Sequence, residues 1–185
     1  MKVIRSPHEL NEGKCVVALG MFDGVHIGHQ SLIREAVRLA GEMNVPCVVC
    51  TFDRHPLSVL RPEMAPEALL SLDENLAKFA ALGADYACVI AFTPEFAAMS
   101  PENYLKSLVS DMGVCAIVAG ENYTFGSRGR GNAEMLRAMQ DELGYRAVIV
   151  PPVMDGDVMA SSTRIRALLR MGETEHAKRL MDISE

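Results

Sequence analysis

The stretch Gly20-Met21-Phe22-Asp23-Gly24-Val25-His26-Ile27-Gly28-His29 places two histidines three residues apart around a glycine. The apolar run before it, residues 15–19, predicts a buried strand, and residues 31–40 after it have the apolar spacing of an amphipathic helix. Glycines let the backbone turn tightly and approach a ligand closely. The start of a helix offers free N–H groups and a positive dipole end to an anion. This strand–turn–helix stretch therefore predicts a phosphate site at which His26 and His29 stabilise transferred charge.

The ordinary alternative is a glycine turn in which Asp23 caps the helix and both histidines face solvent. Asp-Gly pairs are common in turns. We favour the phosphate site because a dense Asp-Gly-x-His-x-Gly-His cluster at the end of a strand is much rarer than a plain turn.

Composition limits the classes of protein that the chain can represent. With 185 residues, 49% of them hydrophobic and 23% charged, residues 1–185 are expected to form a single globular domain. The net charge of -6 and the lack of a basic cluster argue against a nucleic-acid partner, so a phosphate ligand must be met by a few placed cations. The apolar runs are strand-sized and the N-terminus lacks a signal-peptide core, so we expect a cytoplasmic protein without a membrane partner.

Cysteines at positions 15, 47, 50, 88 and 115 all lie in apolar runs, which favours buried thiols over disulfides. Cys47 and Cys50 formally make a CxxC motif. On a strand, however, this spacing sends the two side chains to opposite faces. We therefore predict no metal site made of protein side chains.

Strand-like and helix-like segments alternate along the chain. Strands are predicted near residues 15–20, 46–52, 85–92, 114–119 and 145–150, and helices near 28–43, 73–82, 101–111, 132–143 and 161–181, the last broken near Gly172. This alternation predicts an α/β fold with an open parallel sheet of about five strands and flanking helices. In such sheets ligands bind beyond the carboxyl ends of the strands, where the strand order reverses.

A second candidate site follows the second strand, at Thr51-Phe52-Asp53-Arg54-His55-Pro56. Asp53 is suited to cap a turn, and Pro56 forces His55 toward extended geometry in solvent. The position of these residues beside the end of the first strand favours a ligand role equally.

A third candidate is the segment 120–131, which contains four glycines and two arginines and is interpreted as a mobile cationic loop. Asn122 offers an amide that can read the edge of a ring, and Phe125 offers a flat face for stacking on a planar heterocycle. The alternative is a surface loop with solvated arginines.

A fourth candidate is Ser161-Ser162-Thr163-Arg164-Ile165-Arg166, at the start of the last helical segment. One hydroxyl suffices to cap a helix. Three hydroxyls followed by Arg166 suggest a second phosphate cradle, with the anion assigned to Arg166 rather than to Arg164. Two phosphate sites without an obvious nucleophile indicate catalysis by positioning and charge stabilisation.

The first and fourth segments resemble the HxGH and SSTxxR signatures of the HIGH-type nucleotidyltransferases. The second and third segments resemble the FMN adenylyltransferase module of bacterial FAD synthetases, and the resemblance runs in order through about residues 14–181. It implies a Rossmann-like sheet of the nucleotidyltransferase type. It also implies the reaction of FMN with ATP, as a complex with Mg2+, to give FAD and pyrophosphate.

By position, the resemblance assigns catalysis to His26, His29 and Arg166. It assigns ATP binding to Phe22, Asp23, Gly24, His26, Gly28, His29, Ser161, Ser162, Thr163 and Arg166. It assigns FMN binding to Asp53, His55, Pro56, Asn122, Phe125 and Arg128.

The chain departs from the family pattern in three places. Most members carry a riboflavin kinase domain after this module, whereas this sequence stops at Glu185, so kinase activity is not predicted and a separate riboflavin kinase is a candidate partner. Met21 stands where the family often has Asn or Thr, and residues 158–160 lack a basic residue. Two alternatives stay open: a nucleotidyltransferase for another small phosphate monoester, and a non-catalytic protein that binds flavin or nucleotide.

Overall fold

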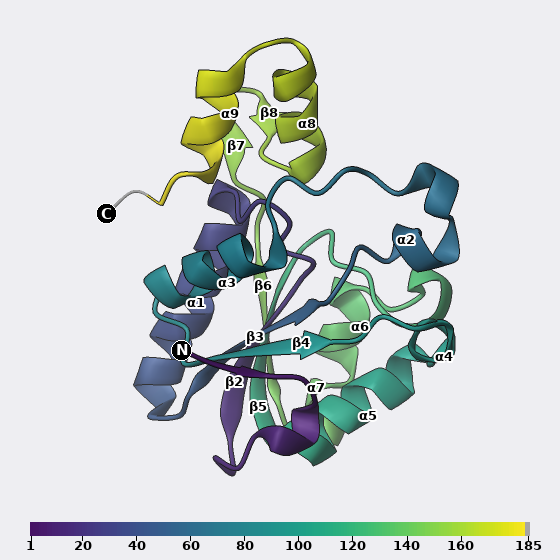
Figure 1. Ribbon diagram of the computed structural model, residues 1–185. Coiled ribbons are helices and arrows are strands. Elements are labelled where there is room, and N and C mark those ends of the chain that lie inside the picture. Colours follow the sequence, from purple (N-terminus) through teal and green to yellow (C-terminus); the bar gives the residue numbers. More distant parts are fainter. Residues whose placement is uncertain (184–185) are drawn as a thin grey trace.

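The computed structural model describes residues 1–183, and within them six parallel strands form one sheet in the order β1-β4-β3-β2-β5-β6 (Figure 1). The strands are β1 (Lys2–Ile4), β2 (Cys15–Leu19), β3 (Cys47–Phe52), β4 (Tyr86–Ile90), β5 (Val114–Gly120) and β6 (Arg146–Val150). The predicted α/β class is confirmed, and all five predicted strands are present. The sheet gains one edge strand, β1, which the sequence analysis missed.

Helices cover both faces of the sheet (Figure 1). Helices α1 (Ile27–Met43) and α3 (Leu72–Ala81) lie on one face, and α5 (Pro101–Met112), α6 (Ala133–Ala138) and α7 (Gln140–Leu143) lie on the other. The short helices α2 (Leu57–Leu60) and α4 (Pro94–Ala98) and the 3-10 turns η1 (Pro7–Glu9), η2 (Pro62–Met64) and η3 (Ser127–Gly129) occupy the connections. The segment predicted as one helix over 132–143 is two helices. The backbone leaves regular α-helical geometry at Met139, where φ is -91° and ψ is -3°.

Each face of the sheet has its own apolar core. Ile33 of α1 and Phe79 of α3 are fully buried in one core, and Leu105 of α5 is fully buried in the other. Cys47 and Cys50 belong to opposite cores, as the alternation along β3 predicts. Within residues 1–183 the five cysteines are free thiols.

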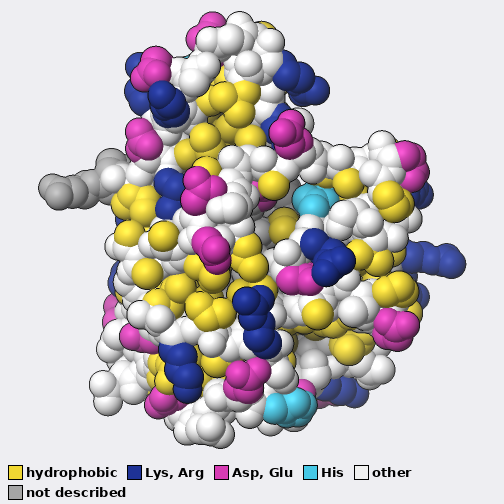
Figure 2. Space-filling model, in the orientation of Figure 1, with side chains coloured by type: hydrophobic (Ala, Val, Ile, Leu, Met, Phe, Trp, Pro, Cys, Tyr) yellow, Lys and Arg dark blue, Asp and Glu magenta, His cyan; other side chains and the backbone are white. Residues whose placement is uncertain are grey.

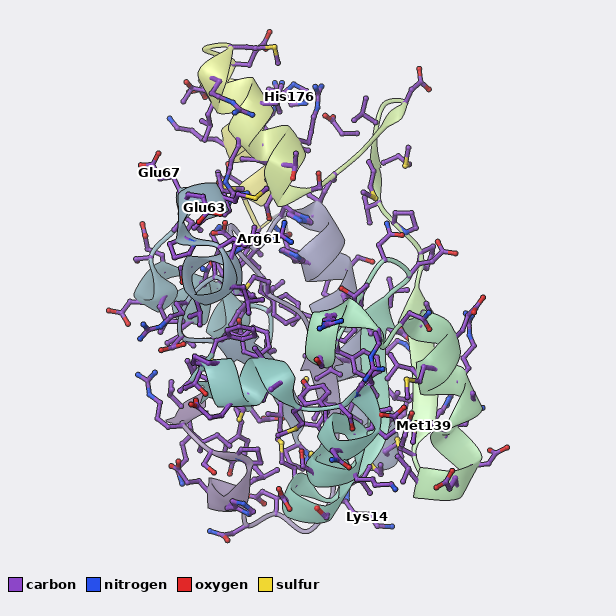
Figure 3. The ribbon with its side chains drawn as sticks, turned by 90° about the vertical axis from the view of Figure 1, so that its right-hand side faces the viewer. Lys14, Arg61, Glu63, Glu67, Met139 and His176 are labelled. Carbon is purple, nitrogen blue, oxygen red and sulfur yellow. The ribbon has the colours of Figure 1, made fainter. Side chains whose placement is uncertain are left out.

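The last part of the chain forms a separate lobe above the sheet (Figure 1). It consists of the hairpin β7 (Met154–Asp155) and β8 (Val158–Met159) with helices α8 (Ser162–Arg170) and α9 (Thr174–Met181). The predicted helical segment is broken at Gly172, where φ is +80°, but the hairpin was not predicted. Ile165 and Leu180 belong to the small core of the lobe, and a 2.9 Å contact from His176 Nε2 to Asp155 joins α9 to the hairpin (Figure 3).

Candidate functional site

The turn that follows β2 has an unusual backbone. Phe22, Gly24 and Val25 have φ values of +54°, +80° and +42°. Positive φ is sterically costly for Phe and above all for a β-branched Val. The surroundings hold this geometry: the Phe22 and Val25 side chains are fully buried, and Thr51 Oγ1 donates a hydrogen bond of 3.0 Å to the Met21 carbonyl. The turn brings His26 to the start of α1.

His26 and His29 form a stacked pair. Their ring centroids are 3.7 Å apart with an interplanar angle of 21°, and the Phe22 ring packs edge-on against His29 at 5.2 Å. His26 caps α1, because its Nδ1 accepts the His29 backbone N–H at 3.4 Å. When the ring is neutral, that acceptor role places the proton on Nε2, which is left to donate to a ligand.

Burial keeps both rings neutral near pH 7. It lowers the pKa of His26 from 6.5 to about 4. Burial, with a smaller contribution from the neighbouring His26, also lowers the pKa of His29 well below its usual value. The pair therefore offers neutral N–H donors to an anion, without the desolvation cost of a buried imidazolium.

These rings lie in a cleft of about 230 Å³, the histidine cleft, at the carboxyl ends of β2, β5 and β6. Its lining includes Gly20, Met21, Phe22, His26, Gly28, His29, Gly120, Asn122, Tyr123, Pro151, Met159 and Ser161. Strand β2 has β3 on one side and β5 on the other, so the strand order reverses here. The cleft thus occupies the position at which doubly wound sheets bind ligands.

A second cavity, the aromatic cavity, adjoins the cleft at Tyr123. It has a volume of about 250 Å³, and its lining includes Phe52, Pro56, Phe92, Phe96, Tyr104, Tyr123, Phe125 and Arg128. Phe52, Phe92 and Phe96 pack edge-to-face with centroids 5.0–5.7 Å apart. Pro56 and Phe125 were among the predicted residues, whereas Phe92 and Phe96 were not, although both follow β4, the neighbour of β3.

A third, small polar cavity of about 140 Å³ neighbours both, because it shares Met21 with the histidine cleft and Phe52 with the aromatic cavity. Its lining includes Asp23, Asp53 and His55. Figure 2 shows a histidine beside a hollow between the lobe and the segment that carries α2. The pKa of His55 is lowered, mainly by burial and to a smaller extent by the positive charge of Arg166.

An ion pair connects the turn to the lobe. Arg166 Nη2 contacts Asp23 Oδ2, and Arg166 Nε donates a hydrogen bond of 2.8 Å to the Glu67 carbonyl. Glu67 lies on the segment beside the lobe (Figure 3). Asp23 Oδ1 accepts the Leu69 N–H at 3.0 Å, and Ser162 Oγ donates to the Asp23 carbonyl at 2.8 Å. The first and fourth sequence motifs are therefore in direct contact.

The remaining hydroxyls of the fourth motif differ in role. Ser161 caps α8 by accepting the Arg164 N–H at 3.1 Å, and it also lines the histidine cleft. Thr163 is exposed. The three hydroxyls therefore do not converge on one point in this structure.

Other predicted residues are also held by structural contacts. Gly28 is packed so closely that a Cβ there would lie 3.2 Å from the His26 ring. Asp53 Oδ1 accepts the Phe92 N–H at 2.9 Å, and its Oδ2 pairs with Arg54. His55 Nδ1 accepts the Leu57 N–H at 3.1 Å.

Asn122 and Phe125, predicted together for one ligand ring, face different cavities among the described residues. Asn122 lines the histidine cleft, with Nδ2 3.3 Å from the Met159 sulfur. Phe125 lines the aromatic cavity and is 6% exposed. Tyr123, between them in sequence, lines both.

The glycine loop after β5 is fastened at several points. Phe125 and Gly131 exchange two backbone hydrogen bonds of 3.1 and 2.9 Å, and the Ser127 N–H donates to the Met99 carbonyl at 2.7 Å. A Cβ at Gly126 would lie 2.6 Å from the backbone nitrogen of Pro101. The glycines were predicted to make this loop mobile, whereas in the structure Gly126 and Gly131 allow close packing.

The fold and the cleft are those of an α/β ligand-binding protein whose cleft lies at the point of strand-order reversal. Residues 8–164 match the FAD synthetase family, and the chain belongs to that family.

Proteins named "Bifunctional riboflavin kinase/FMN adenylyltransferase" are among its relatives. The one from Listeria monocytogenes is 36% identical over 90% of this chain and 53% of its own length. The one from Escherichia coli K12 is 32% identical over 91% of this chain and 55% of its own length. The chain thus spans about half the length of these relatives.

A solved structure titled "Crystal Structure of Macrolide-efflux Protein from Streptococcus pneumoniae" has a TM-score of 0.84 and 32% identity to this chain. It is matched over 97% of this chain and 60% of its own. In this chain, no helix within residues 1–183 combines the length and the apolar character that a membrane span requires.

Proposed function

We propose that this chain is an FMN adenylyltransferase, which transfers AMP from ATP to FMN and releases pyrophosphate. The observation that carries the proposal is the stacked, neutral His26–His29 pair in a cleft that adjoins an aromatic cavity. The histidine N–H groups in the cleft suit the phosphates of a nucleoside triphosphate, and the aromatic walls suit a flat heterocycle. Family membership supports the same reaction.

In this proposal ATP occupies the histidine cleft, and the N–H groups of His26 and His29 donate to its phosphate oxygens. The flavin ring occupies the aromatic cavity, against Phe125 and Pro56 and near Arg128. The FMN phosphate then reaches the cleft past the small polar cavity, where Asp53 and His55 lie. The three spaces are neighbours, because Met21 lines the cleft and the polar cavity and Phe52 lines the polar and aromatic cavities, and the proposal requires the two substrates together to occupy them.

The reaction is an in-line displacement. An oxygen of the FMN phosphate forms a bond to the α-phosphorus of ATP, and the bond from that phosphorus to the bridging oxygen of the pyrophosphate breaks. The histidine N–H groups stabilise the added negative charge without themselves taking a proton. We assign the leaving pyrophosphate to Ser161, Ser162, Thr163 and Arg166. Because the three hydroxyls do not converge in this structure, this assignment requires the start of α8 to rearrange, with Arg166 exchanging contact with Asp23 for contact with the anion.

We propose that Mg2+ enters as part of the ATP complex. Within residues 1–183 there is no group of three or more His, Cys, Asp or Glu side chains that could hold a metal ion. Mg2+ commonly binds through substrate phosphates and keeps several waters, so this residue set is compatible with a substrate-bound ion.

The test is to incubate the chain with ATP, Mg2+ and FMN and to measure FAD, with CTP and other phosphate monoesters as controls. Formation of FAD, lost in His29→Ala, is the expected result. Binding of FMN without formation of FAD would reject the proposal. Turnover of another monoester would favour a different nucleotidyltransferase, and binding without any turnover would favour a flavin- or nucleotide-binding protein.

A further inference from the structure

Gln30 is a buried polar side chain next to His29 that the sequence analysis did not single out. It is fully buried, in the first turn of α1. Its Nε2 donates to three backbone carbonyls: Val25 at 2.9 Å, Met181 at 3.2 Å and Asp182 at 3.1 Å. One amide group therefore touches the turn before His26 and, more than 150 residues later, the end of α9.

The chemistry of its partners fixes the orientation of this amide. All three partners are carbonyl oxygens, which accept hydrogen bonds, so only the NH2 end of Gln30 can face them. Gln30 Oε1, at the other end, has no hydrogen-bond partner among the described residues. The side chain thus satisfies acceptors on its neighbours while its own acceptor stays unpaired.

One segment that Gln30 holds leads directly into the histidine pair, and the other packs against the helix that begins at Ser161. Val25, at a φ of +42°, directly precedes His26 and needs external contacts to keep that conformation. Helix α9 packs on α8 through Leu168 and Leu180, and α8 begins with the Ser161 cap. A shift of either segment changes the position of the histidines relative to Ser161.

We propose that Gln30 is a positioning residue that fixes the histidine pair relative to the start of α8. It acts through the Val25 carbonyl and through the end of α9, without touching a substrate. This inference rests on the proposed function for its effect on turnover. Its effect on the histidine rings does not depend on any activity.

Gln30→Met tests the inference, because Met keeps the length of the side chain and removes the amide. Lys78→Met is the matched control: Lys78 Nζ donates to the same Met181 carbonyl at 2.7 Å, but it comes from α3 and, in the described part of the chain, does not hold the Val25 carbonyl. Two quantities are measured: the NMR signals of the His26 and His29 Cε1–H groups without ligand, and kcat and KM for ATP and FMN.

For Gln30→Met we expect both histidine signals to move and kcat to fall by about tenfold to a hundredfold, with KM changed by less than about threefold, because loss of alignment costs rate more than binding. Lys78→Met should leave the signals and kcat near those of the native chain. Unmoved histidine signals in Gln30→Met, or equal effects in both variants, would overturn the inference and leave Gln30 as an anchor of α9. If Gln30→Met does not fold, Gln30→Asn, which is one methylene short, is judged by the same criteria.

If the native chain makes no FAD, the proposed function fails by itself. The histidine signals still decide whether Gln30 positions the pair.

Discussion

Asp23 and Arg166 lie 143 positions apart in sequence and form an ion pair that joins the histidine turn to α8. Their side chains are only 9% and 18% exposed. Asp23 also accepts the Leu69 N–H, and Arg166 donates to the Glu67 carbonyl, so each charge is further hydrogen-bonded. The pair therefore fastens the lobe to the turn and to the segment before α3.

Removing one partner of this pair should destabilise the fold. We expect Asp23→Asn and Arg166→Met each to lower the free energy of unfolding by about 2 kcal/mol, since each leaves a mostly buried group without its counter-charge. The double variant should lose at least about 1 kcal/mol less than the sum of the single losses. Urea unfolding measures all three values.

Lys178→Met is the control for that comparison, because it breaks the exposed Lys178–Glu175 pair on α9. It should cost less than about 0.5 kcal/mol. Additive losses for Asp23→Asn and Arg166→Met would contradict the coupling.

The depressed pKa of His26 predicts how stability depends on pH. Folding lowers this pKa from 6.5 to about 4, so between these values the unfolded chain binds more protons than the folded one. Stability should therefore fall as the pH drops through this window and show no contribution from His26 above it. The full contribution amounts to about 3 kcal/mol at 1.36 kcal/mol per pKa unit.

Urea unfolding at several pH values from 7.5 down to about 4.5 checks this prediction. His26→Asn keeps a capping side chain without a titrating ring, so it should reduce the dependence and leave the part due to His29 and His55, whose pKa values burial also lowers. An equal slope in the native chain and in His26→Asn would contradict the assignment.

Sequence patterning predicted the sheet well because buried parallel strands are continuous apolar runs. β3 was expected at 46–52 and lies at Cys47–Phe52. β1 could not be found in this way, since it is an edge strand of three residues with two of them exposed. The hairpin of β7 and β8 has only two residues in each strand, too few for any period.

Individual candidate residues could be proposed from the sequence, but their arrangement in space could not. The contact between Asp23 and Arg166 depends on how α8 folds back over the turn, which no local pattern encodes. In the sequence, Gln30 is a polar position beside His29 that no motif or period marks. Its role depends on carbonyls at Met181 and Asp182 that the fold brings to it.

The separation of Asn122 from Phe125 predicts that their substitution affects different substrates. Asn122→Ala should raise KM for ATP about fivefold, because it removes one hydrogen bond to the nucleotide. It should leave KM for FMN within about twofold of the native value. Phe125→Leu, in the aromatic cavity, should do the reverse. Steady-state kinetics with each substrate varied in turn measures both. If Asn122→Ala raised KM for FMN alone, Asn122 would be a contact of the flavin, as the family resemblance implies, and not of ATP.

Gly24 provides a test of the strained turn against a matched glycine. Gly24 and Gly13 have similar φ values, +80° and +76°, so alanine at either position costs about 1 kcal/mol of backbone strain. At Gly24 the added Cβ would also lie 2.9 Å from the Leu69 side chain, whereas at Gly13 nothing lies within 4 Å. We expect Gly24→Ala to lower the free energy of unfolding by about 1 to 2 kcal/mol more than Gly13→Ala, as overpacking does elsewhere.

Because Leu69 donates its N–H to Asp23, displacing Leu69 should also disturb the turn, so Gly24→Ala should lose turnover while Gly13→Ala keeps it. Equal stability and equal turnover in the two variants would mean that the turn tolerates the displacement, and that the contact between Gly24 and Leu69 does not hold the histidine pair in place.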